Sequence, residues 1–156
     1  TLHAIVKIEK NTIIIGPNSD TGNKNIQEII KKVAKNNNLI KVYENIPRQD
    51  FLGFLNNCKV LVGNSSSGMI EASLFKIPVV NIGIRQKNRE HGPNVINVKE
   101  FSKIKIGVAI KKALSKKETE LEVSKIYGNQ KVAKKMINIL EKINVDKELM
   151  EKGLTY

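Results

Sequence analysis

Hydrophobic positions along this chain follow two alternating patterns. Short β-branched or apolar runs occupy residues 12–15, 40–43, 59–62, 79–82 and 94–98, and each predicts a strand. Other segments repeat apolar residues every three or four positions, which predicts one buried face of a helix. These helical segments are 2–8, 23–37, the stretch after Pro47, 69–75, 101–114 and 130–143. The element types of 121–123 and 146–153 are not settled by the pattern.

Strands that alternate with helices predict βαβ units. The expected fold class is therefore α/β, a Rossmann-like parallel sheet with helices on both faces. The 156 residues give room for a single domain over 1–156 with a sizeable core. No internal repeat or low-complexity linker interrupts it, although residues 116–122 form a charged connector.

Composition changes this picture little. Hydrophobic residues make up 40% and charged residues 27%, which is typical of a folded globular protein. No apolar run reaches the length of a membrane span, and residues 1–10 lack the layout of a signal peptide. The single cysteine, Cys58, excludes an internal disulfide and fits a reducing compartment. We therefore expect a cytoplasmic protein with no membrane partner, in which Cys58 serves packing.

The net charge of +12 raises the alternative of a nucleic-acid binder. Most of the excess is lysine spread along helical segments, and aromatic residues are only 4%. Base stacking needs aromatic side chains among the basic ones. The pattern favours a solvated basic surface that attracts anions and predicts no nucleic-acid partner.

The stretch from Gly63 to Glu71 is the strongest chemical signal. It reads Gly-Asn-Ser-Ser-Ser-Gly-Met-Ile-Glu and lies between a predicted strand and a predicted helix. Backbone N–H groups in such a loop, and the positive end of a helix, favour phosphate. Glu71 is placed to accept hydrogen bonds from ribose hydroxyls. The serine loop therefore predicts a nucleoside diphosphate site, and the alternative is that Asn64, Ser65 and Ser66 only cap the helix.

A second polar loop follows the next predicted strand. Residues 83–93 contain Arg85, Arg89 and His91, with Gly and Pro at the ends. Ligand-contacting residues in α/β folds lie at the carboxyl ends of parallel strands, and arginine matches phosphate oxygens with a planar fork of donors. We expect Arg85 to bind the same anion as the serine loop; the alternative is a solvated basic loop.

An earlier loop offers weaker candidates. Pro17, Asn18 and Asp20 follow the first strand, but the later ligands of a calcium loop are absent, so a turn and helix cap is the favoured reading. The two histidines, His3 and His91, are far apart and lack ligand spacing. No metal site and no cofactor are predicted.

These motifs together resemble the UDP-N-acetylglucosamine 2-epimerases. The resemblance runs over residues 54–98 through the pieces Val-Gly-Asn-Ser-Ser-Ser-Gly, Ile-Glu-Ala, Pro-Val-Val-Asn-Ile-Gly and Arg-Gln-x-x-Arg-Glu, with a further piece at 124–128. It is closest to the hydrolysing branch, which yields N-acetylmannosamine and UDP for sialic-acid-type sugars. The Asp-Ser-Gly-Gly and Glu-Arg-Pro-Glu patterns of the non-hydrolysing branch do not occur in this chain.

The resemblance implies roles for individual residues. The serine loop would hold the UDP phosphates, through Asn64, Ser65, Ser66 and Gly68, while Glu71 would bind the ribose. Arg85 would lie near UDP or the sugar. The set Pro17, Asn18, Asp20, Arg89 and His91 would lie near the sugar or the domain interface.

The resemblance also implies a partner. Family enzymes have two Rossmann-like domains in a glycosyltransferase-B-like architecture, and this chain resembles only the second. The acid/base residues would then lie on the first domain, and this chain alone would be inactive. We expect UDP or UDP-N-acetylglucosamine as ligand, with an N-terminal epimerase domain or a homo-oligomer as partner. The chain would then be a truncated or split product, or the other half would be a separate chain. The alternatives are the nucleotide-sugar half of a two-domain glycosyltransferase and a non-catalytic UDP-binding fragment.

Overall fold

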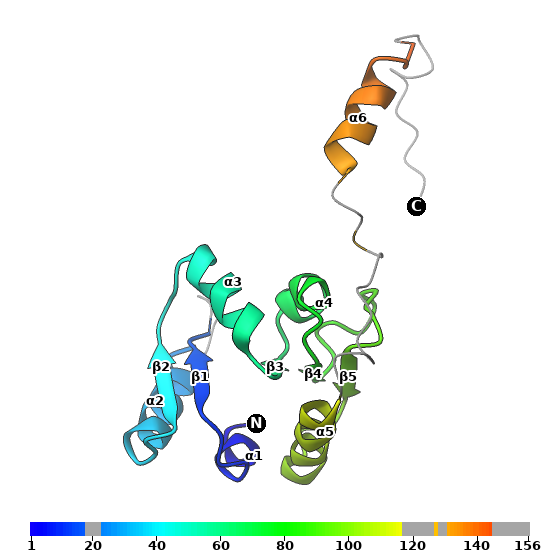
Figure 1. Cartoon of the computed structure of the whole chain (residues 1–156). Coiled ribbons are helices and arrows are strands. Elements are labelled where there is room, and N and C mark those ends of the chain that lie inside the picture. Colours follow the sequence, from blue (N-terminus) through cyan, green and yellow to red (C-terminus); the bar gives the residue numbers. More distant parts are fainter. Residues whose placement is uncertain (18–22, 117–126, 128–130, 145–156) are drawn as a thin grey trace. The chain divides into compact units, whose positions relative to one another are not determined.

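The computed structural model describes the chain except for residues 18–22, 117–126, 128–130 and 145–156. It forms two compact units, residues 1–124 and 125–156, coloured along the sequence in Figure 1. The second unit contains helix α6 (Val132–Leu140), whose apolar side chains are exposed. The single domain over 1–156 stays a prediction.

The first unit confirms the predicted α/β class, with parallel strands flanked by helices (Figure 1). The predicted strands at 12–15, 40–43 and 79–82 have those same bounds in the structure. The elements in order are α1 (Leu2–Val6), β1 (Thr12–Ile15), α2 (Asn23–Lys35), β2 (Ile40–Tyr43), α3 (Arg48–Asn57), β3 (Leu61–Gly63), the 3₁₀ turn η1 (Ser66–Gly68), α4 (Glu71–Leu74), β4 (Val79–Ile82), β5 (Val95–Val98) and α5 (Lys103–Ser115).

The strands form two separate sheets in the described residues. One has the order β1–β2 and the other β3–β4–β5, and every pair is parallel. The sequence reasoning expected one sheet. Apolar runs predict that a segment is a strand, but they carry no information on which strands pair, so this division could not be read from the pattern.

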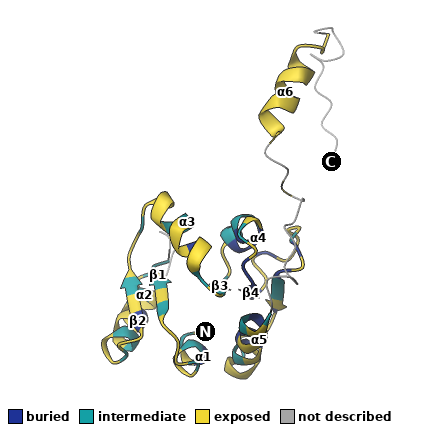
Figure 2. Cartoon of the chain, viewed as in Figure 1, coloured by how far each residue is buried: buried dark blue, intermediate teal, exposed yellow. Residues whose placement is uncertain are grey.

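The three-stranded sheet is covered on both faces because successive side chains of a strand point to opposite sides. Val80 and Ile82 pack with Ile106 and Ile110 of α5 in one core cluster. Val79 packs on the other side, in a cluster with residues of α3, η1, α4 and their flanks, namely Leu55, Met69, Ala72 and Ile77. Figure 2 shows buried residues gathered around β4, α4 and α5, whereas α3 is mostly exposed. Strand β4 is thus the central element that holds both layers together.

The helix predicted at 69–75 is much shorter than expected. The chain forms a three-residue 3₁₀ turn, η1, and then a four-residue helix, α4. The helix ends early because Lys76 takes a left-handed conformation (φ 53°) and Pro78 follows. A macrodipole needs many aligned peptides, so the predicted contribution of a positive helix end at the serine loop was wrong.

A helix that spans a membrane has to be both long and apolar. None of the described helices is long and apolar enough to span a bilayer.

Candidate functional site

The serine loop and the arginine loop meet at one edge of the three-stranded sheet. Strands β3 and β4 are parallel neighbours, with Gly63 opposite Asn81, so their carboxyl ends lie together. The side-chain Nε2 of Gln86 donates a hydrogen bond to the backbone oxygen of Asn64 at 2.9 Å. Gln86 is only 8% exposed. This bond joins the two loops directly and confirms that they share an edge.

The serine loop is shaped by its own side chains. Ser65 caps η1, because its Oγ accepts from the N–H of Ser67 at 3.3 Å, and its backbone oxygen accepts from Gly68. The capping interpretation is therefore confirmed for Ser65. Within the described part of the chain, the N–H groups of Ser65 and Ser66 donate to no protein atom. The cap thus orders the loop and leaves two neighbouring backbone donors for an anion.

Gly68 is fixed by packing against the sheet. A Cβ on Gly68 would lie 2.9 Å from Cγ1 of Val79, closer than a carbon contact tolerates. Gly68 is buried between Ser67 and the equally buried Met69. The close approach that requires glycine here is therefore to β4 of the protein itself, and it seats the serine loop on the core.

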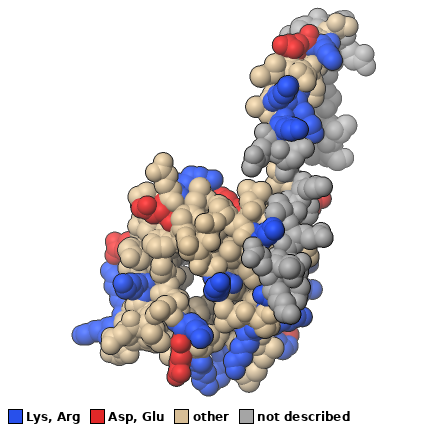
Figure 3. Space-filling model, in the orientation of Figure 1, with Lys and Arg blue, Asp and Glu red and all other residues tan. Residues whose placement is uncertain are grey.

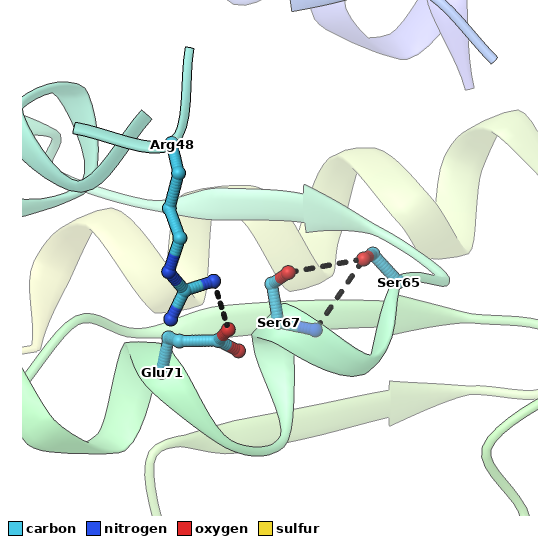
Figure 4. A network of polar contacts seen from close by, with 4 residues as sticks. All are labelled: Arg48, Ser65, Ser67 and Glu71. Carbon is cyan, nitrogen blue, oxygen red and sulfur yellow. Dashed lines mark hydrogen bonds and ion pairs between the residues drawn. The ribbon is translucent and has the colours of Figure 1, made fainter. Parts of the chain in front are cut away.

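Glu71, the first residue of α4, faces a basic residue of another helix. Its Oε1 lies 3.4 Å from Nη1 of Arg48, at the start of α3, and the two side chains are 19% and 72% exposed. Figure 4 shows Arg48 reaching toward Glu71, with the Ser65–Ser67 pair in the adjacent loop. This ion pair orients the carboxylate that the family resemblance assigns to the ribose.

The arginine loop begins at a residue that has to be glycine. Gly83 has a φ of 84°, and a Cβ there would lie 3.1 Å from the ring of Phe101. The chain then turns twice, through Lys87 N–H to Ile84 O at 3.0 Å and Arg89 N–H to Gln86 O at 3.1 Å. Arg85 and Arg89 are exposed on these turns, on either side of the buried Gln86.

His91 is tied back to the sheet through a chain of amides. Its Nδ1 lies 3.0 Å from the carbonyl oxygen of Gly92, and its Nε2 lies 3.0 Å from Nδ2 of Asn97. Asn97 in turn accepts from Asn81 at 2.7 Å, across the β4–β5 pair. A carbonyl only accepts, so this arrangement places the proton on Nδ1 and makes Nε2 the acceptor. His91 is half-buried and held in place.

For the remaining candidate residues, the structure shows burial but few specific contacts. Pro17 is half-buried just after β1, and Asn18 and Asp20 lie outside the described residues. Cys58 packs at the edge of the cluster around Leu55, and burial raises the pKa of its thiol above the ordinary value of 9.0. Its predicted packing role is confirmed. No group of three acidic, histidine or cysteine side chains in the described ranges is arranged to hold a metal ion.

Basic side chains are dispersed over the surface. Figure 3 shows lysines and arginines in separate places on the face in view, with acidic and uncharged residues between them. Among the described residues in view, the basic side chains do not join into one continuous stripe, which is the usual footprint of a nucleic-acid groove. The charge distribution on this face fits a general attraction for anions.

Sequence reasoning missed Gln86, Arg48 and the Asn81–Asn97 pair. Gln86 looked like one more polar residue of a basic loop, since its burial is invisible in the sequence. Asn81 carried a signal, because it is a polar residue inside the apolar run Val-Val-Asn-Ile. Buried amides need partners, so such a residue points to a polar contact between strands.

Comparison with known protein families matches residues 1–141 to the family described as UDP-N-acetylglucosamine 2-epimerase. The chain is 32% identical over 155 residues, 99% of its length, to the UDP-N,N'-diacetylbacillosamine 2-epimerase (hydrolyzing) of Legionella pneumophila. It is 36% identical over 107 residues, 68% of its length, to the UDP-N-acetylglucosamine 2-epimerase of Neisseria meningitidis. It is 38% identical over 81 residues, 51% of its length, to the GDP/UDP-N,N'-diacetylbacillosamine 2-epimerase (hydrolyzing) of Campylobacter jejuni.

The matched parts are short relative to these proteins. The alignments span 40% of the Legionella protein, 27% of the Neisseria protein and 21% of the Campylobacter protein. The chain thus corresponds to less than half of each relative.

Proposed function

This chain belongs to the UDP-N-acetylglucosamine 2-epimerase family, and on that premise we propose that it supplies the UDP-binding half of a hydrolysing 2-epimerase. The substrate in the proposal is UDP-N-acetylglucosamine, and the products are N-acetylmannosamine and UDP. The remaining half of the active site would come from an N-terminal epimerase domain, and the two-domain enzyme would assemble as a homo-oligomer.

One observation carries this proposal. The hydrogen bond from the buried Gln86 side chain to Asn64 brings the arginine loop against the serine loop, where the Ser65 and Ser66 N–H groups have no protein acceptor in the described residues. Backbone donors combined with guanidinium groups are the usual means of binding a diphosphate. A capped loop that satisfied all of its own donors would not support the proposal.

The residues divide by the part of the ligand that they would contact. Asn64, Ser65 and Ser66 would face the phosphates, with Gly68 seating their loop and Arg85 adding charge from the arginine loop. Glu71 would accept hydrogen bonds from the ribose, in the orientation that Arg48 gives it. Pro17, Asn18, Asp20, Arg89 and His91 would lie toward the sugar or the partner domain.

The chemistry of the whole enzyme follows from the family resemblance. A base removes the C2 proton while the C1–O bond to UDP breaks, which leaves a glycal. Water then adds across the double bond, and C2 receives its proton from the opposite face. Negative charge builds on the departing diphosphate, so the serine-loop N–H groups and Arg85 would stabilise the transition state. The base would lie on the other half of the enzyme.

A second sugar has a specific observation in its favour. The Legionella relative, aligned over 99% of this chain, is named for UDP-N,N'-diacetylbacillosamine. Both substrates share UDP, which is the part proposed to bind here. The choice between them would rest on residues that contact the sugar, and competition between the two UDP-sugars in the full enzyme distinguishes them.

Calorimetric titration tests the proposal directly. UDP should bind the purified chain saturably, and ADP at the same concentration should give little heat. ADP is the control for the net charge of the chain, which attracts both nucleotides equally. Equal binding of UDP and ADP, or no binding by a chain shown to be folded by circular dichroism, would contradict the proposed half-site.

A further inference from the structure

In the peptide unit between Asn64 and Ser65, the carbonyl group is hydrogen-bonded to the protein and the N–H group is not, among the described residues. Its carbonyl oxygen accepts the hydrogen bond from Gln86 at 2.9 Å, while its N–H, on Ser65, has no protein acceptor in the described residues. A trans peptide is planar, with the C=O and the N–H pointing in opposite directions. Fixing the oxygen therefore also fixes the direction of the N–H.

We propose that Gln86 is a positioning residue that locks this peptide plane and so presents the Ser65 N–H to the diphosphate. The inference rests on the proposed UDP-binding function and assigns a specific role within that site. Without the amide of Gln86, the peptide can rotate and place a carbonyl oxygen where the donor stood, which would repel an anion.

The surroundings of Gln86 suit this role. Gln86 is 8% exposed, so the donor of this part-buried hydrogen bond is held inside the protein, and losing it would cost the Asn64 carbonyl its protein partner. Its own backbone oxygen accepts from Arg89 N–H at 3.1 Å, and its neighbour Arg85 is exposed. Gln86 therefore faces inward at the turn whose exposed residues are Arg85, proposed near the phosphates, and Arg89, proposed near the sugar or the partner domain. The side chain of Gln86 thus holds the serine loop, while its backbone oxygen belongs to the turn of the arginine loop.

The test compares two variants of Gln86 with a matched control. Gln86→Leu keeps the size and burial but removes the donor, and UDP affinity should fall roughly five- to tenfold, the worth of one hydrogen bond. Gln49→Leu makes the same change on the exposed surface of α3 and should bind UDP like the parent chain. Unchanged affinity in a folded Gln86→Leu would overturn the proposal.

Gln86→Glu adds a second measurement, the pH dependence of UDP affinity, which would not change if Gln86 only filled space. A protonated carboxyl can donate to the Asn64 oxygen, whereas a carboxylate cannot. Burial at position 86 would raise the pKa of the new carboxyl, so its protonated, donating form grows as the pH falls. The ratio of variant to parent Kd should therefore be about tenfold at pH 8 and clearly smaller at pH 5. Measuring the parent at both pH values cancels the titration of UDP itself and any effect of His91 and the neighbouring Arg85, Lys87, Arg89 and Glu90. A ratio independent of pH would contradict the role, and this variant carries the test even if Gln86→Leu does not fold.

A ligand-free measurement separates this proposal from the proposed function. Residual dipolar couplings of the Ser65 N–H report its orientation by NMR. They should fit the structure in the parent chain and depart from it in Gln86→Leu, with Val80 and Ile82 unchanged as internal controls. An unaltered Ser65 coupling would overturn the positioning role. A changed coupling in a chain that binds no UDP would keep the role of Gln86 in the loop and reject the UDP site.

Discussion

Strands β1 and β4 have similar lengths but opposite relations to the protein interior. The run of β1, Thr-Ile-Ile-Ile, is the more apolar, yet Ile13 and Ile15 are 42% and 37% exposed. The run of β4, Val-Val-Asn-Ile, contains an amide, and all four residues are buried. Burial thus follows the position in the fold and the number of covered faces. The loops that follow the doubly covered sheet are the ones that form the candidate site.

Matched isoleucine substitutions in β4 and β1 test most directly whether the two strands differ in burial. Ile82→Ala in β4 should lower the free energy of unfolding by about 2–5 kcal/mol, because it leaves a cavity between the sheet and α5. Ile13→Ala in β1 removes the same atoms from a half-solvated site and should cost less than about 1 kcal/mol. Urea unfolding measures both. Equal costs would mean that the two sheets are equally covered in solution.

Removing one positive charge next to each sheet tests whether UDP binds at the three-stranded sheet and not at the other. Arg85→Ala, after β4, should weaken UDP binding by about 1–3 kcal/mol, the scale of a hydrogen bond to a charged group. Lys41→Ala, on the exposed side of β2, also removes one positive charge and should leave the affinity nearly unchanged. Calorimetry measures each. If both variants lose affinity alike, the overall charge attracts UDP and Arg85 has no special contact.

The close contact between Gly68 of the serine loop and Val79 of β4 can be tested by a rescue experiment. Gly68→Ala should destabilise the fold by about 1–3 kcal/mol, because the new Cβ meets Val79. Adding Val79→Ala should make the double variant less unstable than the two single costs combined. Gly53→Ala, in α3 with open space around it, should stabilise by up to about 1 kcal/mol. Strict additivity of Gly68→Ala and Val79→Ala in thermal unfolding would rule out the contact.

The smallest expected difference is between the two ion pairs of these regions. Arg48–Glu71 links α3 to α4, and its glutamate is only 19% exposed, whereas both partners of Lys31–Glu44 are well exposed. Double-mutant cycles with Arg48→Gln and Glu71→Gln should give a coupling of about 0.5–1 kcal/mol, against about 0–0.3 kcal/mol for Lys31→Gln and Glu44→Gln. A larger coupling at Lys31–Glu44 would contradict the expectation that the less exposed pair is the stronger one.

Prediction of the site from the sequence succeeded at the level of loops. The serine and arginine motifs follow neighbouring parallel strands, and the topology of βαβ units then requires their carboxyl ends to meet at one edge. The contribution of a helix dipole failed because α4 is only four residues long. The roles of individual residues in binding UDP stay predictions, and the titrations above test them.

The sequence by itself determined the α/β class, the positions of the strands, the family and the two polar loops, because these depend on local periodicity and on motifs read along the chain. Only the tertiary structure decided that β1–β2 is separate from β3–β4–β5, that Gly68 packs on Val79 and that His91 is bound to Asn97. It also decided that Gln86, 22 residues away in sequence, holds the Asn64 carbonyl. Strand pairing and buried polar contacts depend on which surfaces meet in three dimensions, and a single sequence does not encode that in any local pattern.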